Sequence, residues 1–341
     1  MLRRTLFAAV GAVTLGLAMG LPPMALAQQA KVLKISHQFP GGTIDEGDFR
    51  DRLVRRFAQE VEQKSGGQLK FEIYPASSLM KPVPQFKAMS TGALDMSLYP
   101  LAYSGSEFPE ANLGLMPALV TSYDQGLRWK TAPIGKELTR LTEEKGVKII
   151  TWIWQAGGIA AKGKPVVSPD DAKGMKVRGG SREIDLMVRA AGGAVTNVPS
   201  NEIYSAMQSG VLDAAVTSST SLISFRLHEN SNFLTAGRNN TFWYMFEPLL
   251  MSKKAFDGLT PAQQKLVMDV GVSLEKFGME AAKGDDQRVV EVYAKAGNKV
   301  VDMDQAAFEK WREIAKNSAW KDFEEKVKNG KALMEMAVSV K

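Results

Sequence analysis

Two short runs near the start of the chain alternate between apolar and polar residues, and a helical pattern lies between them. Residues 31–36 and 68–74 show the period of two that is typical of half-buried strands. Residues 45–64 instead place apolar side chains at helical spacing, and the Ser-Gly-Gly sequence at 65–67 ends that helix. A strand, a helix and a strand in this order predict a βαβ unit, and therefore a sheet that is at least partly parallel.

The alternation of strands and helices continues along the chain and then restarts. Residues 147–154 form the run with the strongest β-propensity, rich in branched and aromatic side chains, and this run ends at Gly157 and Gly158. Shorter elements surround it. The expected strands are 94–99, 174–178, 194–198 and 212–216, and the expected helices are 84–91, 183–191 and 200–209. The restart predicts a second α/β lobe, with a chain that crosses between the lobes more than once.

The last third of the chain is predominantly helical. Residues 245–251 are predicted to form a returning strand, and Pro261 begins a long helical stretch that runs to about residue 295, with a break near Gly284. Further helices are expected at 305–315 and 320–336. The predicted domain boundaries are 28–150 for lobe I, to which 241–260 return, 151–240 for lobe II, and 261–341 for the long helix and the C-terminal helices.

Residues 1–27 have the pattern of a secretory signal peptide. Arg3 and Arg4 precede an apolar run at 6–21, and the Ala-Leu-Ala sequence at 25–27 provides a small-x-small cleavage site. The alternative is a retained membrane anchor, against which this cleavage site and the two prolines before it argue. We therefore expect the segment to be removed, leaving a mature protein that is exported and soluble.

Charge and composition exclude several classes of function. The formal net charge of +6 is modest and spread along the chain, which does not match a nucleic-acid-binding surface. The sequence has no cysteine and two histidines, His37 and His228, so cysteine nucleophiles, zinc clusters and most histidine-based triads lack their residues. The phosphate-binding and nucleophile motifs of common enzymes are also missing. We therefore expect no enzymatic activity, no cofactor, no metal and no nucleic-acid partner.

The sequence delivers an arginine to the end of a strand. Arg178 closes the short strand expected at 174–178, and Gly179 and Gly180 follow, where the backbone can approach a ligand closely. In open α/β sheets, ligands bind beyond the carboxyl ends of the strands. The spacing leaves two interpretations open: a salt bridge from Arg178 to a neighbouring carboxylate of the protein, or a bidentate grip on the carboxylate of a ligand.

Aromatic side chains are the second candidate feature. Trp152 and Trp154 are predicted to share one face of a strand, and Trp243, Tyr244 and Phe246 lie close together in a later run. Most of these rings are expected in the core. However, one or two rings beside a charged anchor are the usual lining of a small-ligand pocket.

Seven short motifs carry a family resemblance when they are taken in order. They are Phe-Ala-Gln-Glu-Val at 57–61 followed by Ser-Gly-Gly, Ile-Tyr-Pro-Ala-Ser-Ser-Leu at 73–79, Gly-Ala-Leu-Asp-Met at 92–96, Phe-Pro-Glu at 108–110, Asp-Asp-Ala-Lys-Gly-Met-Lys-Val-Arg at 170–178, Glu-Ile-Tyr at 202–204 with Gln-Ser-Gly-Val-Leu-Asp at 208–213, and Leu-Thr-Pro-Ala-Gln-Gln at 259–264. Together they resemble the DctP-like family, the extracytoplasmic solute-binding proteins of tripartite ATP-independent periplasmic (TRAP) transporters. The resemblance covers essentially the whole mature chain.

The resemblance implies an α/β fold of the two-lobe periplasmic solute-binding type, with a long helix that bridges the lobes and a ligand cleft between them. It implies a periplasmic protein that binds an organic acid and delivers it to the membrane subunits of a TRAP permease. Separately, we expect the protein to be a monomer. In that family the arginine that ends the Lys-Gly-x-Lys-x-Arg motif binds the carboxylate of the ligand, and Arg178 holds this position. A protein that senses a ligand for a membrane receptor would use the same closed form, so this alternative stays open.

Two departures from the family pattern bear on the ligand. Members that bind sialic-acid-type ligands carry a second arginine where this chain has Gly158, and Asp-Gly-Gln-Glu-Asn where it has Asp-Ala-Ala-Val-Thr at 213–217. The smaller, less polar groups favour a monocarboxylate with an apolar or aromatic body. Arg182 could supply a second charge, which would favour a dicarboxylate or a sugar acid. The candidate ligand-binding residues are Arg178, Trp154, Thr217, Trp243, Phe246, Gln38, Tyr99, Ser200, Arg182 and His37.

Overall fold

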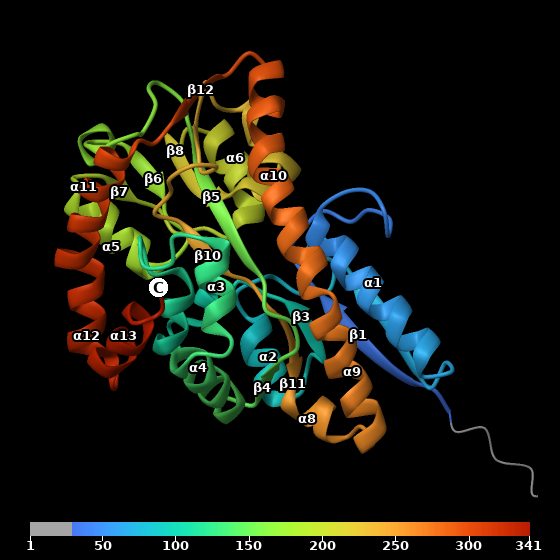
Figure 1. Cartoon of the computed structure of the whole chain (residues 1–341). Helices are drawn as coiled ribbons and strands as arrows, with labels where there is room; N and C mark the ends of the chain where they lie inside the picture. The colour runs from blue at the N-terminus through green and yellow to red at the C-terminus, as the bar shows by residue number, and fades with distance from the viewer. Residues whose placement is uncertain (1–28) are drawn as a thin grey trace, which may run out of the picture.

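Two β-sheets organise residues 29–341, which are the part of the chain described by the computed structural model (Figure 1). The first sheet has five strands in the order β2-β1-β3-β11-β4. They are β1 (Lys31–Ser36), β2 (Leu69–Tyr74), β3 (Met96–Leu98), β4 (Val147–Ile149) and β11 (Leu249–Ser252). β1 pairs in parallel with β2 and β3, which confirms the predicted βαβ unit, whereas β11 runs antiparallel to β3 and β4. This sheet and its helices are called lobe I.

The second sheet, which forms the base of lobe II, has seven strands. Their order is β12-β9-β5-β8-β6-β7, and β10 pairs with β5. They are β5 (Trp154–Ala161), β6 (Lys176–Arg178), β7 (Ala194–Val195), β8 (Ala214–Ser218), β9 (Phe233–Ala236), β10 (Tyr244–Phe246) and β12 (Lys299–Asp302). The sequence pattern does not predict β12, which pairs in parallel with β9 and adds a C-terminal strand to lobe II.

Two runs predicted as single strands are each split between the lobes. The run at 147–154 forms β4 in lobe I and the start of β5 in lobe II, and the run at 245–251 forms parts of β10 in lobe II and β11 in lobe I. The two crossings lie side by side, because the amide of Glu247 donates to the carbonyl of Ile153 at 2.9 Å. Periodicity indicates a strand but not the sheet that the strand joins, so the pattern predicts one strand where the chain forms two.

The paired glycines at 157 and 158 lie inside β5 rather than at its end. A Cβ at Gly157 would come within 2.4 Å of the Trp243 ring, and a Cβ at Gly158 within 2.6 Å of the carbonyl oxygen of Thr235. The glycines therefore allow neighbouring segments to pack closely against β5, and they do not form a turn.

Helices pack against both sheets. They are α1 (Phe49–Lys64), α2 (Gln85–Thr91), α3 (Tyr123–Trp129), α4 (Pro133–Glu144), α5 (Arg182–Ala190), α6 (Ile203–Gln208), α7 (Ser219–Ser224), α8 (Lys253–Asp257), α9 (Pro261–Ser273), α10 (Glu275–Lys295), α11 (Gln305–Ala315), α12 (Lys321–Lys326) and α13 (Gly330–Val338). α1 begins after Asp48, whose carboxylate caps the helix by accepting from the amide of Arg50.

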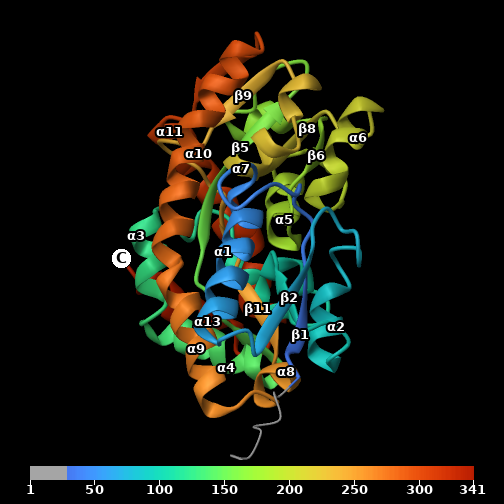
Figure 2. The ribbon, with the colours of Figure 1, turned by 90° about the vertical axis from the view of Figure 1, so that its right-hand side faces the viewer.

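The long helical stretch breaks at Leu274 and not near Gly284. α9 ends and α10 begins around Leu274, whereas Gly284 lies within α10. A Cβ at Gly284 would meet no other atom within 4 Å, so this glycine faces open space and interrupts nothing. α10 contacts α1 of lobe I and β5 and α7 of lobe II. Figures 1 and 2 show that it runs alongside both lobes.

The C-terminal helices α11–α13 cover the opposite side of the molecule from α10 (Figure 1). The indole of Trp311 donates to the carbonyl of Val167 at 2.9 Å, and that of Trp320 donates to the carbonyl of Pro117 at 2.8 Å. The single helix predicted at 320–336 is interrupted between α12 and α13. Within residues 29–341, no helix has both the length and the apolar content for crossing a membrane. The predicted signal peptide at 1–27 lies outside the described residues.

Candidate ligand site between the lobes

Arg178 ends β6, and its guanidinium is buried where the two lobes meet. The residue is 2% exposed. Its Nε donates to the carbonyl of Val198 at 3.0 Å, its Nη1 to the carbonyl of Val216 at 2.9 Å, and its Nη2 to the hydroxyl of Tyr103 at 2.9 Å. Both carbonyls come from lobe II, whereas Tyr103 follows β3 of lobe I. The guanidinium therefore joins the lobes.

No carboxylate of the described chain neutralises Arg178. Within residues 29–341, no carboxylate oxygen lies within 4.0 Å of its guanidinium nitrogens. Burial raises the pKa of the Asp185 carboxyl to about 6, and this effect is larger than the opposing effect of the positive charge on Arg178, which lowers the pKa. A guanidinium has five N–H groups, of which the contacts above use three. The salt-bridge interpretation of Arg178 is therefore wrong, and N–H groups are left for another acceptor.

The two glycines after Arg178 let the backbone fold over the guanidinium. Gly180 has a φ of 95°, and a Cβ at this position would lie 2.7 Å from Nη1 of Arg178. The carbonyl of Gly179 accepts from the indole of Trp243 at 3.4 Å. Glycine at position 180 is required both by the left-handed backbone and by the close approach of the arginine.

Tyr103 is a residue of the site that the sequence analysis missed. Its hydroxyl oxygen accepts from Arg178 and also from the amide of Ser200 at 3.0 Å, so one lobe I hydroxyl binds two lobe II donors. Tyr99, the tyrosine predicted for the site, packs edge to face against the Tyr103 ring. Its hydroxyl donates to the Val83 carbonyl at 3.2 Å. The position of Tyr103 just beyond a parallel strand was the available signal.

A cavity of about 240 Å³ is lined by both lobes, and Arg178 itself is not among its lining residues. Tyr103 and Gly180, which both contact the guanidinium, form part of its wall. The lining residues are Val83, Ala102, Tyr103, Gly105, Ser106 and Asn112 from lobe I, and Gly180, Ser181, Arg182, Asn197 and Pro199 from lobe II. The wall joins the lobes directly, because the hydroxyl of Ser181 donates to the carbonyl of Leu115 at 3.3 Å. A cavity of this size suits a small metabolite.

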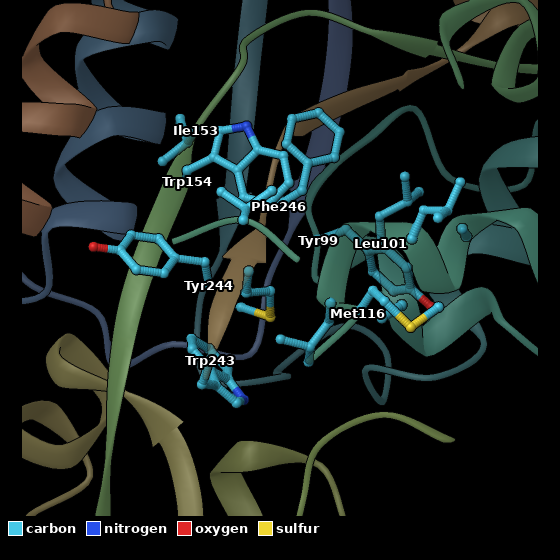
Figure 3. Packing of buried hydrophobic residues seen from close by; sticks show 14 of the residues in the cluster. Tyr99, Leu101, Met116, Ile153, Trp154, Trp243, Tyr244 and Phe246 are labelled. Atoms are coloured by element: carbon cyan, nitrogen blue, oxygen red, sulfur yellow. The ribbon is translucent and has the colours of Figure 1, made fainter. Parts of the chain in front are cut away.

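The predicted aromatic residues are all buried, in two places. Trp154 and Phe246 lie together with ring centroids 5.3 Å apart. The Trp152 ring is tilted against Phe246, with centroids 4.5 Å apart, although Trp152 lies outside the strand. Figure 3 shows Trp154 and Phe246 side by side, with Trp243 on another side of the cluster. The indole nitrogen of Trp154 is buried without a hydrogen-bond partner in the described chain. Trp243 is the ring that hydrogen-bonds to the Arg178–Gly180 segment within residues 29–341, through its indole nitrogen and the Gly179 carbonyl.

The other residues predicted to contact the ligand differ in whether their polar side-chain atoms already have hydrogen-bond partners in the protein. Gln38 is 2% exposed, and neither polar atom of its amide has a partner within residues 29–341. His37 is committed elsewhere, since its Nε2 lies 3.1 Å from a carboxylate oxygen of Asp51. Thr217 is buried in β8 opposite Gly158. Their assignment as ligand contacts stays a prediction.

Arg182 faces the outer side of the cavity. Its guanidinium lies 2.5 Å from a carboxylate oxygen of Asp322 and 3.3 Å from one of Glu183, and its side chain is 45% exposed. It lines the cavity that Tyr103 also lines. A ligand contact by Arg182 would therefore compete with Asp322. No group of three or more metal-ligating side chains suited to a metal ion occurs in residues 29–341.

A second buried arginine, which the sequence analysis also missed, joins the lobes beside the crossings. The guanidinium of Arg50 in α1 binds the Asp48 carboxylate at 2.6 and 2.8 Å. Its Nη1 also lies 3.0 Å from the hydroxyl of Ser221 in lobe II and 3.4 Å from a carboxylate oxygen of Glu247. All four residues are buried. Unlike Arg178, this arginine is fully neutralised by protein carboxylates.

Several buried carboxyls make the stability of the fold depend on pH. Burial raises the pKa of Glu247 and Glu183 to about 7 and that of Asp286 to about 6. In the unfolded chain these groups ionise near pH 4. We therefore expect the free energy of unfolding to fall as pH rises from about 4.5 to about 7, by at most about 1.4 kcal/mol per pH unit for each group.

Below that window the trend reverses. Although burial opposes it, the charge of Arg50 and hydrogen bonds from Arg50 lower the pKa of Asp48, so protonating Asp48 below pH 4 costs stability. Urea unfolding measured from pH 3 to pH 8 checks the expected maximum near pH 4.5. Glu247→Gln should reduce the loss between pH 4.5 and 7, and an unchanged slope in this variant would contradict the assignment to Glu247.

Comparisons with known proteins agree on one family. The model of the DctP family, described as bacterial extracellular solute-binding protein, family 7, matches residues 43–326. A solute-binding protein of Albidiferax ferrireducens is 60% identical over 324 residues, which are 95% of this chain and 95% of that protein. The C4-dicarboxylate-binding periplasmic protein DctP of Rhodobacter capsulatus is 27% identical over 308 residues, 86% of each chain.

A solved structure agrees with this result. It is the crystal structure of a TRAP periplasmic solute-binding protein from Rhodoferax ferrireducens with bound malonate. Its sequence is 60% identical, its TM-score is 0.88, and the match covers 89% of this chain and 96% of that chain.

Proposed function

The chain belongs to family 7 of the bacterial extracellular solute-binding proteins, and we propose that it captures an organic acid through Arg178 and delivers it to the membrane subunits of a TRAP transporter. Membership confirms the resemblance seen in the sequence and the two-lobe α/β fold, and the family consists of binding proteins rather than enzymes. The ligand, the anchor and the partner are the parts that we propose.

One observation carries the proposed anchor: Arg178 is a buried cation without a protein carboxylate in the described chain. Burying an unpaired charge is costly, so buried charges are normally paired. The carbonyls of Val198 and Val216 and the hydroxyl of Tyr103 hold the guanidinium in place but carry no full negative charge. A ligand carboxylate would supply it, through the N–H groups that these contacts leave free.

We propose a monocarboxylate with an apolar or aromatic body as the ligand, because Trp243 lies next to the arginine and Gly158 stands where other members carry a second arginine. Gln38 supports a polar contact at a further point, since its amide is buried without partners in residues 29–341. A short dicarboxylate is the second candidate. The relative of known structure that is 60% identical holds malonate, and Arg182 lines the same cavity.

Binding and closure are coupled in this proposal. Tyr103 and Leu115 of lobe I contact Arg178, Ser200 and Ser181 of lobe II, and these contacts form only when the lobes are together. Carrying a hinge from mostly open to mostly closed takes about 5.5 kcal/mol of preference for the closed form. Each hydrogen bond between a carboxylate and a guanidinium contributes about 1.5–3 kcal/mol, so two such bonds supply much of that preference.

We propose further that residues 1–27 direct export to the periplasm, that the mature chain acts as a monomer, and that the lobes divide near 150 and 240. The family is extracellular by description, which supports export. The alternative function is ligand sensing for a membrane receptor, and no contact within residues 29–341 favours it. The similarity to TRAP solute-binding proteins supports a function in transport.

A thermal-shift screen tests the proposed function. Malonate and a set of aromatic, 2-keto and 2-hydroxy acids are added to the mature protein, each beside its neutral amide. A cognate acid present at a hundred times its Kd should raise Tm on the order of 5 °C, because ligand binding stabilises the folded state by mass action. The amide should give no shift, since it lacks the negative charge. Equal shifts with acids and amides would contradict an anchor that pairs with a carboxylate.

A further inference from the structure

Asn112 is a polar residue of the cavity whose hydrogen-bonding capacity is unused by the protein. It lies in the short helical segment Pro109–Leu115 of lobe I and is 2% exposed. Its amide oxygen is buried and has no hydrogen-bond partner within residues 29–341. Leaving a buried acceptor unpaired costs about 1–3 kcal/mol, so such atoms usually have a partner in the functional state.

The local backbone makes room for this amide at the cavity wall. A Cβ at Gly105 would lie 2.1 Å from the Asn112 amide oxygen and 2.8 Å from its amide nitrogen, so only glycine fits at position 105. Gly105 has an ordinary helical φ of −57°, which means that space and not backbone conformation requires the glycine here. Both residues line the cavity between the lobes.

Tyr103 presents the complementary chemistry on the same wall. Its hydroxyl oxygen already accepts from Arg178 and from the amide of Ser200. A phenol oxygen with two incoming donors has its own proton left to give. Ser181 offers nothing further, because its hydroxyl donates to Leu115 and accepts from the amide of Ile184. Among the residues that line the cavity, the buried side-chain atom left without a partner in residues 29–341 is therefore an acceptor, the Asn112 amide oxygen, and the Tyr103 hydroxyl has a proton to donate.

We infer that the ligand is a hydroxy acid, whose hydroxyl group donates to Asn112 and accepts from Tyr103 while its carboxylate pairs with Arg178. A hydroxyl is the group that can donate and accept at once, whereas a second carboxylate can only accept. Tyr103 contacts Arg178 at 2.9 Å, so the two protein groups are close enough for one short molecule to reach both. This inference rests on the proposed function and narrows it. It makes Asn112 the residue that selects for the hydroxyl.

The test uses three pairs of acids that differ only in the hydroxyl: lactate and propionate, mandelate and phenylacetate, and hydroxymalonate and malonate. Isothermal calorimetry on the wild-type protein should show the hydroxylated member of a pair binding at least tenfold more tightly, since a buried polar pair rejects an analogue that cannot hydrogen-bond to it. In Asn112→Leu that preference should disappear while the Kd of the unsubstituted acid changes by less than about threefold. Asn317→Leu, which makes the same change at an exposed position outside the cavity, should keep the preference.

Failure of this inference is distinguishable from failure of the proposed function. Binding of the acids by the wild-type protein without preference for the hydroxyl in any pair would overturn the role of Asn112 and leave the Arg178 anchor standing. A preference for the hydroxylated acids that persists in Asn112→Leu would also overturn the proposed role of Asn112. Absence of binding by all six acids would contradict the organic-acid proposal itself. The wild-type comparison does not depend on the folding of a variant.

Discussion

Arg178→Ala is expected to weaken binding of the cognate acid by at least a hundredfold. The variant loses two hydrogen bonds between the guanidinium and the ligand carboxylate, worth about 1.5–3 kcal/mol each, which corresponds to a change in Kd of roughly 10² to 10⁴. Arg178→Lys should recover little of the loss, because an ammonium cannot bind a carboxylate in a fork or hold the carbonyls of Val198 and Val216 together. Isothermal calorimetry with the acid found by the thermal-shift screen measures both variants.

The matched control is Arg189→Ala, which removes an exposed guanidinium from the same part of lobe II. Its Kd should stay within about threefold of the wild-type value, since the exposed charge lies outside the cavity and is screened by solvent. Circular dichroism verifies that Arg178→Ala is folded. A folded Arg178→Ala protein with near-wild-type affinity would remove Arg178 from the site.

Arg50→Met is expected to cost the largest amount of stability, about 3–5 kcal/mol in the free energy of unfolding. Asp48 and Glu247 are both buried beside Arg50, so the variant leaves two carboxyls without their cation. The loss of the contact to Ser221 also removes a link between the lobes. Urea unfolding at pH 7 measures the effect.

Two comparisons make this result specific. Arg140→Met breaks ion pairs with Glu137 and Glu144 on the surface and should cost less than about 1 kcal/mol. The double variant Arg50→Met, Glu247→Gln should be more stable than Arg50→Met alone, because it removes one of the two uncompensated carboxyls. A loss in Arg50→Met no larger than in Arg140→Met would show that the buried network does not stabilise the fold.

The pattern of apolar and polar residues predicted those parts of the fold that are determined by residues close together in the sequence. The βαβ unit at the N-terminus follows from two alternating runs and one helical run, and the structure confirms its parallel pairing. The position of Arg178 at a strand end also follows from a local pattern. By contrast, the two crossings between the lobes interrupt runs with continuous β-propensity at 147–154 and 245–251, and only the pairing of distant segments decides where each run leaves its sheet.

The contacts that build the site are mostly long-range, which explains why some were missed. Arg178 meets Tyr103 across 75 positions of sequence, and Arg50 meets Ser221 across 171. No periodicity or short motif encodes such a pair. Tyr99 was predicted and Tyr103 was not, because both follow the same strand and the turn that selects between them is a short helical segment at Leu101–Ser104.

The central claim is that Arg178 holds the carboxylate of an acid enclosed between the lobes. A crystal structure of the mature protein with the acid that gives the largest thermal shift tests it most directly. The account predicts carboxylate oxygens within about 3 Å of both Nη atoms of Arg178, with the lobes closed over the molecule. An acid bound away from Arg178, with the guanidinium paired to a carboxylate of the protein, would contradict it.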